Sequence, residues 1–122
     1  MGEGTYGKVY RATTTDSKET YAVKCIPIEK FRKIRKLHEF TKNEIYVLEK
    51  LDHPSIVKYY EKLNTVNNTY MVYEYCDEGT LEKKIYSNKF LKEDDALVYF
   101  SQMLSALCLM DTHHILHRDL KP

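Results

Sequence analysis

Three glycines near the start of the chain have the spacing of a loop that can hold a polyphosphate. Gly2, Gly4 and Gly7 form a GxGxxG pattern, with Val9 two residues later. Glycine has no Cβ, so such a loop can approach phosphate oxygens closely and direct its amide N–H groups toward them. The pattern also fits a glycine-rich β-turn without a ligand. A dinucleotide-binding fold needs a helix directly after the third glycine, whereas residues 9–13 predict a strand.

A lysine and a glutamate further along the chain could supply the charges of a phosphate site. Lys24 ends a strand-like Tyr-Ala-Val-Lys segment, and Glu44 lies in a region with helical character. A lone strand lysine is usually a solvated edge charge, and glutamate is an ordinary helix former. As a pair, the lysine could reach the phosphates of a nucleotide while the carboxylate holds its flexible stem in place. Neither residue decides the matter by itself.

The last six residues are the most specific segment of the chain. They read His-Arg-Asp-Leu-Lys-Pro, in which Asp119 and Lys121 stand two residues apart. Such a segment could be no more than a polar loop after a helix. The company of the glycine loop and Lys24 argues against that interpretation.

The elements that must position these residues are mostly strands in the first part of the chain. Lysine- and glutamate-rich residues from about 31 to 51 predict one inserted helix, which ends before Pro54. Alternating residues predict the strands, and polar pairs or triplets predict the turns. The expected strands are residues 8–13, 21–26, 56–60 and 69–75, with turns at 16–18 and 67–68.

The second part of the chain is expected to be helical. A short helix follows Gly79, and a long helix covers residues 93–110 with three acidic residues in its first turn. Apolar residues recur in this long helix at spacings of three and four, which is typical of a helix buried on a broad face. In residues 1–122 alone little is expected to cover that face, so an exposed apolar patch is predicted. The fold class is therefore α+β, with antiparallel strands and one inserted helix followed by a helical region.

Composition excludes several classes of function. The chain has 122 residues and a net charge of +1, so neither nucleic acid nor a membrane surface is expected as a partner. Cys25, Cys76 and Cys108 form no CxxC pair, and they predict neither a disulfide framework nor a zinc site. A cytoplasmic protein is expected, and the oligomeric state stays open.

Five motifs occur together in one order along the whole chain. They are the glycine loop, Tyr-Ala-Val-Lys, the Glu44 helix leading into residues 51–57, the strand ending at Glu74, and His-Arg-Asp-Leu-Lys-Pro. In this order the chain resembles the eukaryotic protein kinase family, and Lys121 resembles the lysine that marks its serine/threonine members. The resemblance implies a five-stranded antiparallel sheet with one long helix in a first lobe. It divides the chain into that lobe at residues 1–75, a hinge at 76–79 and the start of a second lobe at 80–122.

The resemblance also implies roles for individual residues. Lys24 would bind the α- and β-phosphates of ATP while paired with Glu44, Asp119 would be the catalytic base, and Lys121 would help to neutralise the γ-phosphate. Tyr73 falls at the gatekeeper position, where a bulky side chain closes the rear of the adenine pocket. ATP and Mg²⁺ are the implied cofactors. The implied contacts to ATP are Gly2, Glu3, Gly4, Thr5, Tyr6, Gly7, Val9, Ala22, Lys24, Tyr73, Glu74 and Cys76.

The function that the resemblance implies is transfer of the ATP γ-phosphate to serine and threonine hydroxyls of protein substrates. The family's metal ligands follow the position that matches Pro122, so the domain is expected to be incomplete and residues 1–122 alone are not expected to catalyse the transfer. The subfamily is open between calcium/calmodulin-type and NIMA-like kinases. Two other functions remain: a catalytically inactive remnant that binds a nucleotide or partner, and an interaction protein that docks through its sheet and the Glu44 helix.

Overall fold

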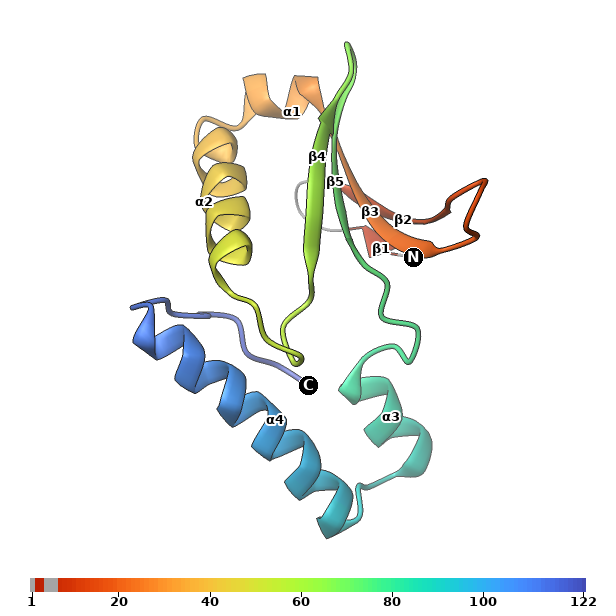
Figure 1. The fold of residues 1–122 in the computed structure, drawn as a ribbon, viewed down its shortest axis with the longest axis vertical. Coiled ribbons are helices and arrows are strands. Elements are labelled where there is room, and N and C mark those ends of the chain that lie inside the picture. Colours follow the sequence, from red (N-terminus) through yellow and green to blue (C-terminus); the bar gives the residue numbers. More distant parts are fainter. Residues whose placement is uncertain (1, 4–6) are drawn as a thin grey trace. The chain divides into compact units, whose positions relative to one another are not determined.

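The computed structural model describes residues 2–3 and 7–122 and divides into two compact units (Figure 1). The first unit holds residues 1–50 and 57–76, and the second holds residues 51–56 and 77–122.

An antiparallel sheet forms most of the first unit (Figure 1). Its spatial order is β1-β2-β3-β5-β4, so the α+β class predicted from the sequence is confirmed. β1 has only two residues, and the other four strands make up nearly the whole sheet. The strands are β1 (Gly2–Glu3), β2 (Lys8–Thr13), β3 (Thr20–Pro27), β4 (Tyr59–Asn64) and β5 (Asn68–Glu74).

Local turn chemistry sets the ends of these strands. The β2–β3 hairpin is closed by a bond from the Thr14 N–H to the Glu19 carbonyl at 3.0 Å, and Lys18 takes a positive φ of 56°. The predicted turn at 16–18 is confirmed, whereas the strand predicted at 56–60 begins only at Tyr59. Pro54 lies in a turn that ends with a bend at Ile56, so the backbone becomes extended later than the apolar residues suggest.

Two helices replace the single long helix that the sequence predicted. α1 (Ile28–Lys33) and α2 (Leu37–Lys50) are separated at Ile34, whose φ of −110° and ψ of 100° are extended. In an unbroken helix Leu37 would lie about 120° around the axis from Phe31, because each residue turns by about 100°. The break lets both side chains enter the core, where Phe31 is 8% and Leu37 1% exposed.

The core of the first unit lies between these helices and one face of the sheet (Figure 1). Its members come from β3, α1, α2 and β5: Ile26, Phe31, Leu37, Met71 and Tyr73. Burial of each such side chain contributes roughly 1.5–3 kcal/mol. The core therefore fixes α2, which carries Glu44, against the strands that carry Lys24 and Tyr73.

The second unit consists mainly of two helices. α3 (Leu81–Asn88) begins at Thr80, whose hydroxyl accepts the Lys83 N–H at 3.2 Å. α4 (Glu93–Thr112) starts where the sequence predicted and continues two residues beyond Met110. No helix within the described residues is both long and apolar enough to cross a membrane.

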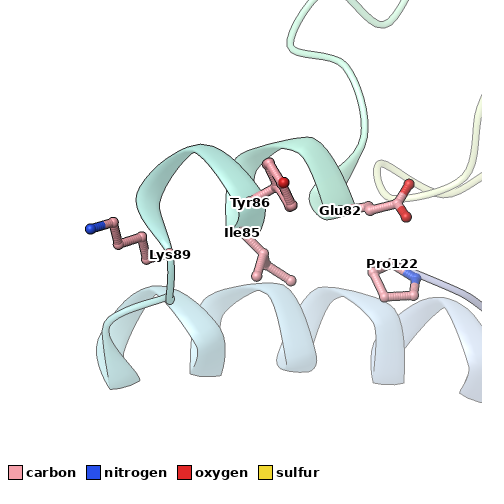
Figure 2. A pocket seen from close by; sticks show the side chains of 5 residues that line it. All are labelled: Glu82, Ile85, Tyr86, Lys89 and Pro122. Carbon is pink, nitrogen blue, oxygen red and sulfur yellow. The ribbon is translucent and has the colours of Figure 1, made fainter.

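The broad face of α4 is not buried within the described residues, so the apolar patch predicted for residues 1–122 is confirmed. Within α4 only Ala106 and Met110 are buried, whereas Leu97 and Phe100 are 57% and 60% exposed. Periodicity predicts which residues share a face, but burial also requires an element that covers the face. α3 and the chain end leave a depression of about 550 Å³, which Figure 2 shows with the residues that line it: Glu82, Ile85, Tyr86, Lys89 and Pro122.

Candidate active site

Strand register gathers the predicted nucleotide-binding residues on one face of the sheet. Lys24 lies opposite Val9 on β2 and Met71 on β5, and Ala22 lies opposite Tyr73. Directly paired residues share a face in an antiparallel sheet, and so do residues two apart on one strand. Val9, Ala22, Lys24 and Tyr73 therefore lie on the face that α1 and α2 cover.

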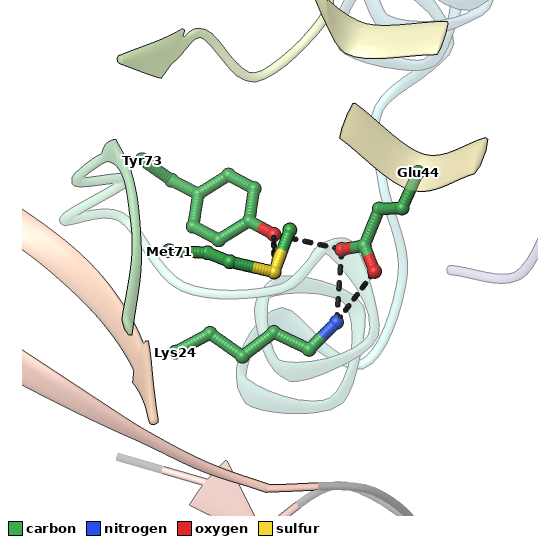
Figure 3. Close-up of polar contacts among 4 residues, drawn as sticks. All are labelled: Lys24, Glu44, Met71 and Tyr73. Atoms are coloured by element: carbon green, nitrogen blue, oxygen red, sulfur yellow. Dashed lines mark hydrogen bonds and ion pairs between the residues drawn. The ribbon is translucent and has the colours of Figure 1, made fainter. Parts of the chain in front are cut away.

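Lys24 and Glu44 form a bidentate ion pair between β3 and α2 (Figure 3). The Lys24 ammonium donates to Glu44 Oε1 at 2.8 Å and to Oε2 at 2.7 Å. The side chains are only 24% and 36% exposed, so salt and water screen this pair less than a surface pair. An ammonium has three N–H donors, so one remains for a further acceptor.

The Tyr73 hydroxyl is a third member of this cluster (Figure 3). It donates to Glu44 Oε1 at 2.8 Å and also lies 3.5 Å from the Met71 sulfur. A phenol has one proton, and the nearer, charged oxygen is much the better acceptor. Burial raises the pKa of Tyr73 far above its usual range, and the negative charge of Glu44 and the hydrogen bond to it add to the rise. The phenol therefore stays neutral and keeps its proton.

Close packing accounts for one glycine of the predicted phosphate loop. A Cβ on Gly7 would collide with the backbone carbonyl oxygen of Cys25 on β3. Gly2 and Glu3 form β1 and pair with Val9 and Lys8. Gly4, Thr5 and Tyr6 lie outside the described residues, so their predicted contacts with phosphate stay predictions.

The two residues predicted to hold the adenine, Glu74 and Cys76, lie at the end of β5 and two residues beyond it. The Glu74 N–H donates to the Lys58 carbonyl at 2.8 Å, and Glu74 Oε2 accepts the Lys58 N–H at 3.1 Å. The Glu74 backbone N–H is thus already used within the sheet unit. Cys76 follows two residues later as an exposed residue.

The second unit carries Asp119 and Lys121 as an exposed ion pair. The Lys121 ammonium donates to Asp119 Oδ2 at 2.8 Å, and the two side chains are 75% and 71% exposed. The Asp119 N–H donates to His117 Nδ1 at 3.3 Å, and Arg118 between them has a positive φ of 65°. The hydrogen bond from Lys121, followed by its positive charge, lowers the pKa of the Asp119 carboxyl below its usual 3.8.

An open depression of about 600 Å³ adjoins this pair within the second unit. Its walls combine hydroxyl, amide and apolar groups, and both residues of the pair line it. The lining residues are Ser55, Thr80, Leu81, Tyr99, Gln102, Met103, His117, Asp119, Lys121 and Pro122. Within residues 2–3 and 7–122, no three histidine, cysteine, aspartate or glutamate side chains gather as ligands of one metal ion would.

Comparison with known proteins decides which family this arrangement represents. The protein kinase domain matches residues 1–122, which is the whole chain. The chain belongs to the protein kinase domain family. The predicted resemblance is thereby confirmed. The curated relatives are serine/threonine protein kinases.

The curated relatives of this kinase chain include plant and protozoan enzymes. It is 38% identical over 122 residues to CBL-interacting serine/threonine-protein kinase 2 of Arabidopsis thaliana and 39% identical to CBL-interacting protein kinase 2 of Oryza sativa. It is 36% identical to calcium-dependent protein kinase 5 of Plasmodium falciparum. Each match covers the whole chain but 26%, 27% and 21% of the relative, so the chain spans about a quarter of their length.

Sequence reasoning paired Lys24 with Glu44 but missed the hydroxyl that joins them. Tyr73 was assigned only bulk at the rear of a pocket, whereas the structure places its hydroxyl on the Glu44 carboxylate. The two residues are 29 positions apart and lie on different elements. No local pattern predicts such a contact. It depends on the register of β3 against β5 and on where α2 packs against the sheet, and neither is known from the sequence.

Proposed function

We propose that this kinase chain binds ATP and takes part in transferring its γ-phosphate to serine or threonine hydroxyls of protein substrates. The observation that carries the proposal is the bidentate Lys24–Glu44 pair, held at 2.8 and 2.7 Å on the inner face of the sheet. Lys24 lies on the central strand of the sheet and its pair with Glu44 is partly buried, so Lys24 is not the solvated edge charge of the alternative interpretation. Membership of the protein kinase domain family supports the same conclusion.

The proposed ATP site uses backbone and side chains of the first unit. Val9 and Ala22 cover the adenine from the sheet, and the third N–H of Lys24 reaches the α- and β-phosphates. An adenine amino group is a donor, so it would bond to the Glu74 carbonyl oxygen, while the Glu74 N–H is already used by the Lys58 carbonyl. The Cys76 N–H would donate a hydrogen bond to a ring nitrogen of the adenine. In this assignment, residues 1–75 form the first lobe, 76–79 the hinge and 80–122 the start of the second lobe.

Asp119 is the proposed catalytic base of the second unit. The substrate hydroxyl oxygen forms a bond to the γ-phosphorus, the bond from that phosphorus to the bridging oxygen of ADP breaks, and Asp119 accepts the hydroxyl proton. The lowered pKa of Asp119 keeps it ionised and ready to orient the hydroxyl. Lys121 supplies positive charge beside it. The family uses Mg²⁺ with ATP, and a bound ion would neutralise charge on the phosphates; within the described residues no three histidine, cysteine, aspartate or glutamate side chains gather as its ligands would.

The test is phosphate transfer by the full-length gene product that contains these residues. Radiolabelled γ-phosphate should pass from ATP to serine and threonine in a peptide library, and Asp119→Asn should abolish the transfer while ATP binding persists. Binding of ATP without any transfer by the wild-type protein would favour the inactive nucleotide-binding alternative. Failure to bind ATP at all would refute the proposal and leave a docking function.

A further inference from the structure

We infer that Tyr73 is a positioning residue whose hydroxyl orients the Glu44 carboxylate, and through it the Lys24 ammonium, toward the phosphates of the nucleotide. The inference rests on the proposed function, and it adds a polar task to a residue otherwise assigned by its bulk. Tyr73 touches neither the reacting atoms nor the phosphates in this scheme. It acts through Glu44.

The geometry of the carboxylate carries the inference. Glu44 Oε1 accepts two hydrogen bonds, one from Lys24 at 2.8 Å and one from Tyr73 at 2.8 Å, and Oε2 accepts the other Lys24 bond at 2.7 Å (Figure 3). Lysine and glutamate are long, flexible side chains, so a pair made of these two alone retains considerable freedom. Tyrosine has only two side-chain torsions, so its hydroxyl fixes the plane of the carboxylate at little further entropic cost.

The ring of Tyr73 is itself fixed by the core. It is 8% exposed, belongs to the buried cluster, and lies edge-to-face with Tyr59 at a centroid distance of 5.8 Å. Neighbouring Met71 has no exposed surface. The core therefore sets the position of the hydroxyl independently of Glu44. The Glu44 carboxylate accepts its hydrogen bond from a donor that is held in place on β5.

The neutrality of the donor matters for Lys24. A second cation in place of Tyr73 would compete with Lys24 for the carboxylate and would repel the ammonium. A phenol that keeps its proton strengthens the carboxylate's hydrogen-bond network without adding charge. Among the described residues Lys24 is thus the one charged donor to Glu44, and its third N–H is directed elsewhere.

The test compares nucleotide binding by full-length Tyr73→Phe and the wild-type protein, using calorimetry with ADP and with adenosine. ADP carries the α- and β-phosphates, whereas adenosine has no phosphate and reports only on the base pocket. We expect Tyr73→Phe to weaken ADP binding about fivefold or more and to leave adenosine binding unchanged. In a Glu44→Gln background the same change should have a much smaller effect, because the hydroxyl acts through the carboxylate.

Tyr70→Phe is the matched control. Tyr70 lies on the same strand but one residue from Met71, hence on the opposite face, and its hydroxyl accepts from Asn68 at 3.1 Å. Removing that hydroxyl should leave binding of both ligands unchanged.

A second measurement does not depend on a ligand. The rate at which an amine-acylating reagent modifies Lys24, followed by peptide mass spectrometry, should rise several-fold in Tyr73→Phe while the rate at Lys62 stays constant. Equal acylation rates, equal ADP affinities, or equal weakening of ADP and adenosine would each overturn the inference but leave the proposed function standing. A wild-type protein that binds neither ligand would overturn the proposed function and the inference together.

Discussion

Two of the ion pairs among the described residues, Lys24–Glu44 and Lys121–Asp119, have the same charges and nearly the same lengths, but they are built in opposite ways. Lys24 and Glu44 are 20 residues apart and come from a strand and a helix, whereas Asp119 and Lys121 are two residues apart in one segment. The first pair is 24% and 36% exposed, and the second is 75% and 71% exposed. A short distance therefore does not by itself show how much an ion pair contributes to stability. That contribution depends on burial and on the elements that hold the two side chains together.

The largest expected effect is on the pair that the fold enforces. Lys24→Met in the full-length protein should reduce phosphate transfer by about 100-fold or more, because it removes a charged donor from the proposed phosphate site. Glu44 keeps only the Tyr73 hydrogen bond in this variant, so the thermal midpoint should fall by a few degrees while the chain stays folded. Transfer rates and a melting curve check both parts. Normal turnover by Lys24→Met would show that another group holds the phosphates.

Exchanging lysine for arginine should separate the two pairs more finely. Lys24→Arg should lower transfer about tenfold, because a planar guanidinium has different donor directions and more volume than an ammonium in a partly buried site. Lys121→Arg should cost clearly less, since solvent surrounds that pair and leaves room to adjust. Initial rates of the two variants provide the comparison, and equal losses would mean that exposure does not distinguish the pairs.

Local stability should respond at one pair only. Glu44→Gln should lower the free energy of opening of α2 by about 1 kcal/mol, because charge-assisted hydrogen bonds become neutral ones. Hydrogen exchange of the amides in Leu37–Lys50 measures this directly. Asp119→Asn serves as the control and should leave that exchange unaltered. Faster exchange in both variants would argue that the pairs are equivalent.

The smallest effect is a shift in one titration. Lys121 holds the pKa of Asp119 below 3.8, so Lys121→Met should raise that pKa toward 3.8. Carboxyl carbon shifts measured by NMR as a function of pH will show the change. A carboxylate with a higher pKa becomes protonated at a higher pH. The pH below which the transfer rate falls should therefore rise as well. An unchanged pKa would mean that the pair does not persist in solution.

Local patterns predicted much of the fold. Alternating residues located β2 with its observed bounds, and the acidic first turn located the start of α4. The break at Ile34 escaped prediction because its cause is the core, which needs both Phe31 and Leu37, while the charged residues around it are typical of one continuous helix.

The candidate site shows the same limit. Residue types and order were enough to single out Lys24 and Glu44, since few side chains can serve phosphate chemistry at those positions. The Tyr73 bond to Glu44 depends on strand register, on the seat of α2 and on burial of a ring, none of which is written in neighbouring residues. The exposed face of α4 is the converse case, because its pattern is typical of burial but does not show what would cover it.

The crowding at Gly7 affects how genetic data on this chain should be interpreted. A side chain there has to displace the Cys25 carbonyl, so a substitution first disturbs the contact between β2 and β3. In a mutational scan, position 7 should therefore behave as a folding position as well as a nucleotide position. Loss of protein abundance would accompany loss of activity, and the evolutionary constancy of such a glycine would reflect selection for an intact sheet.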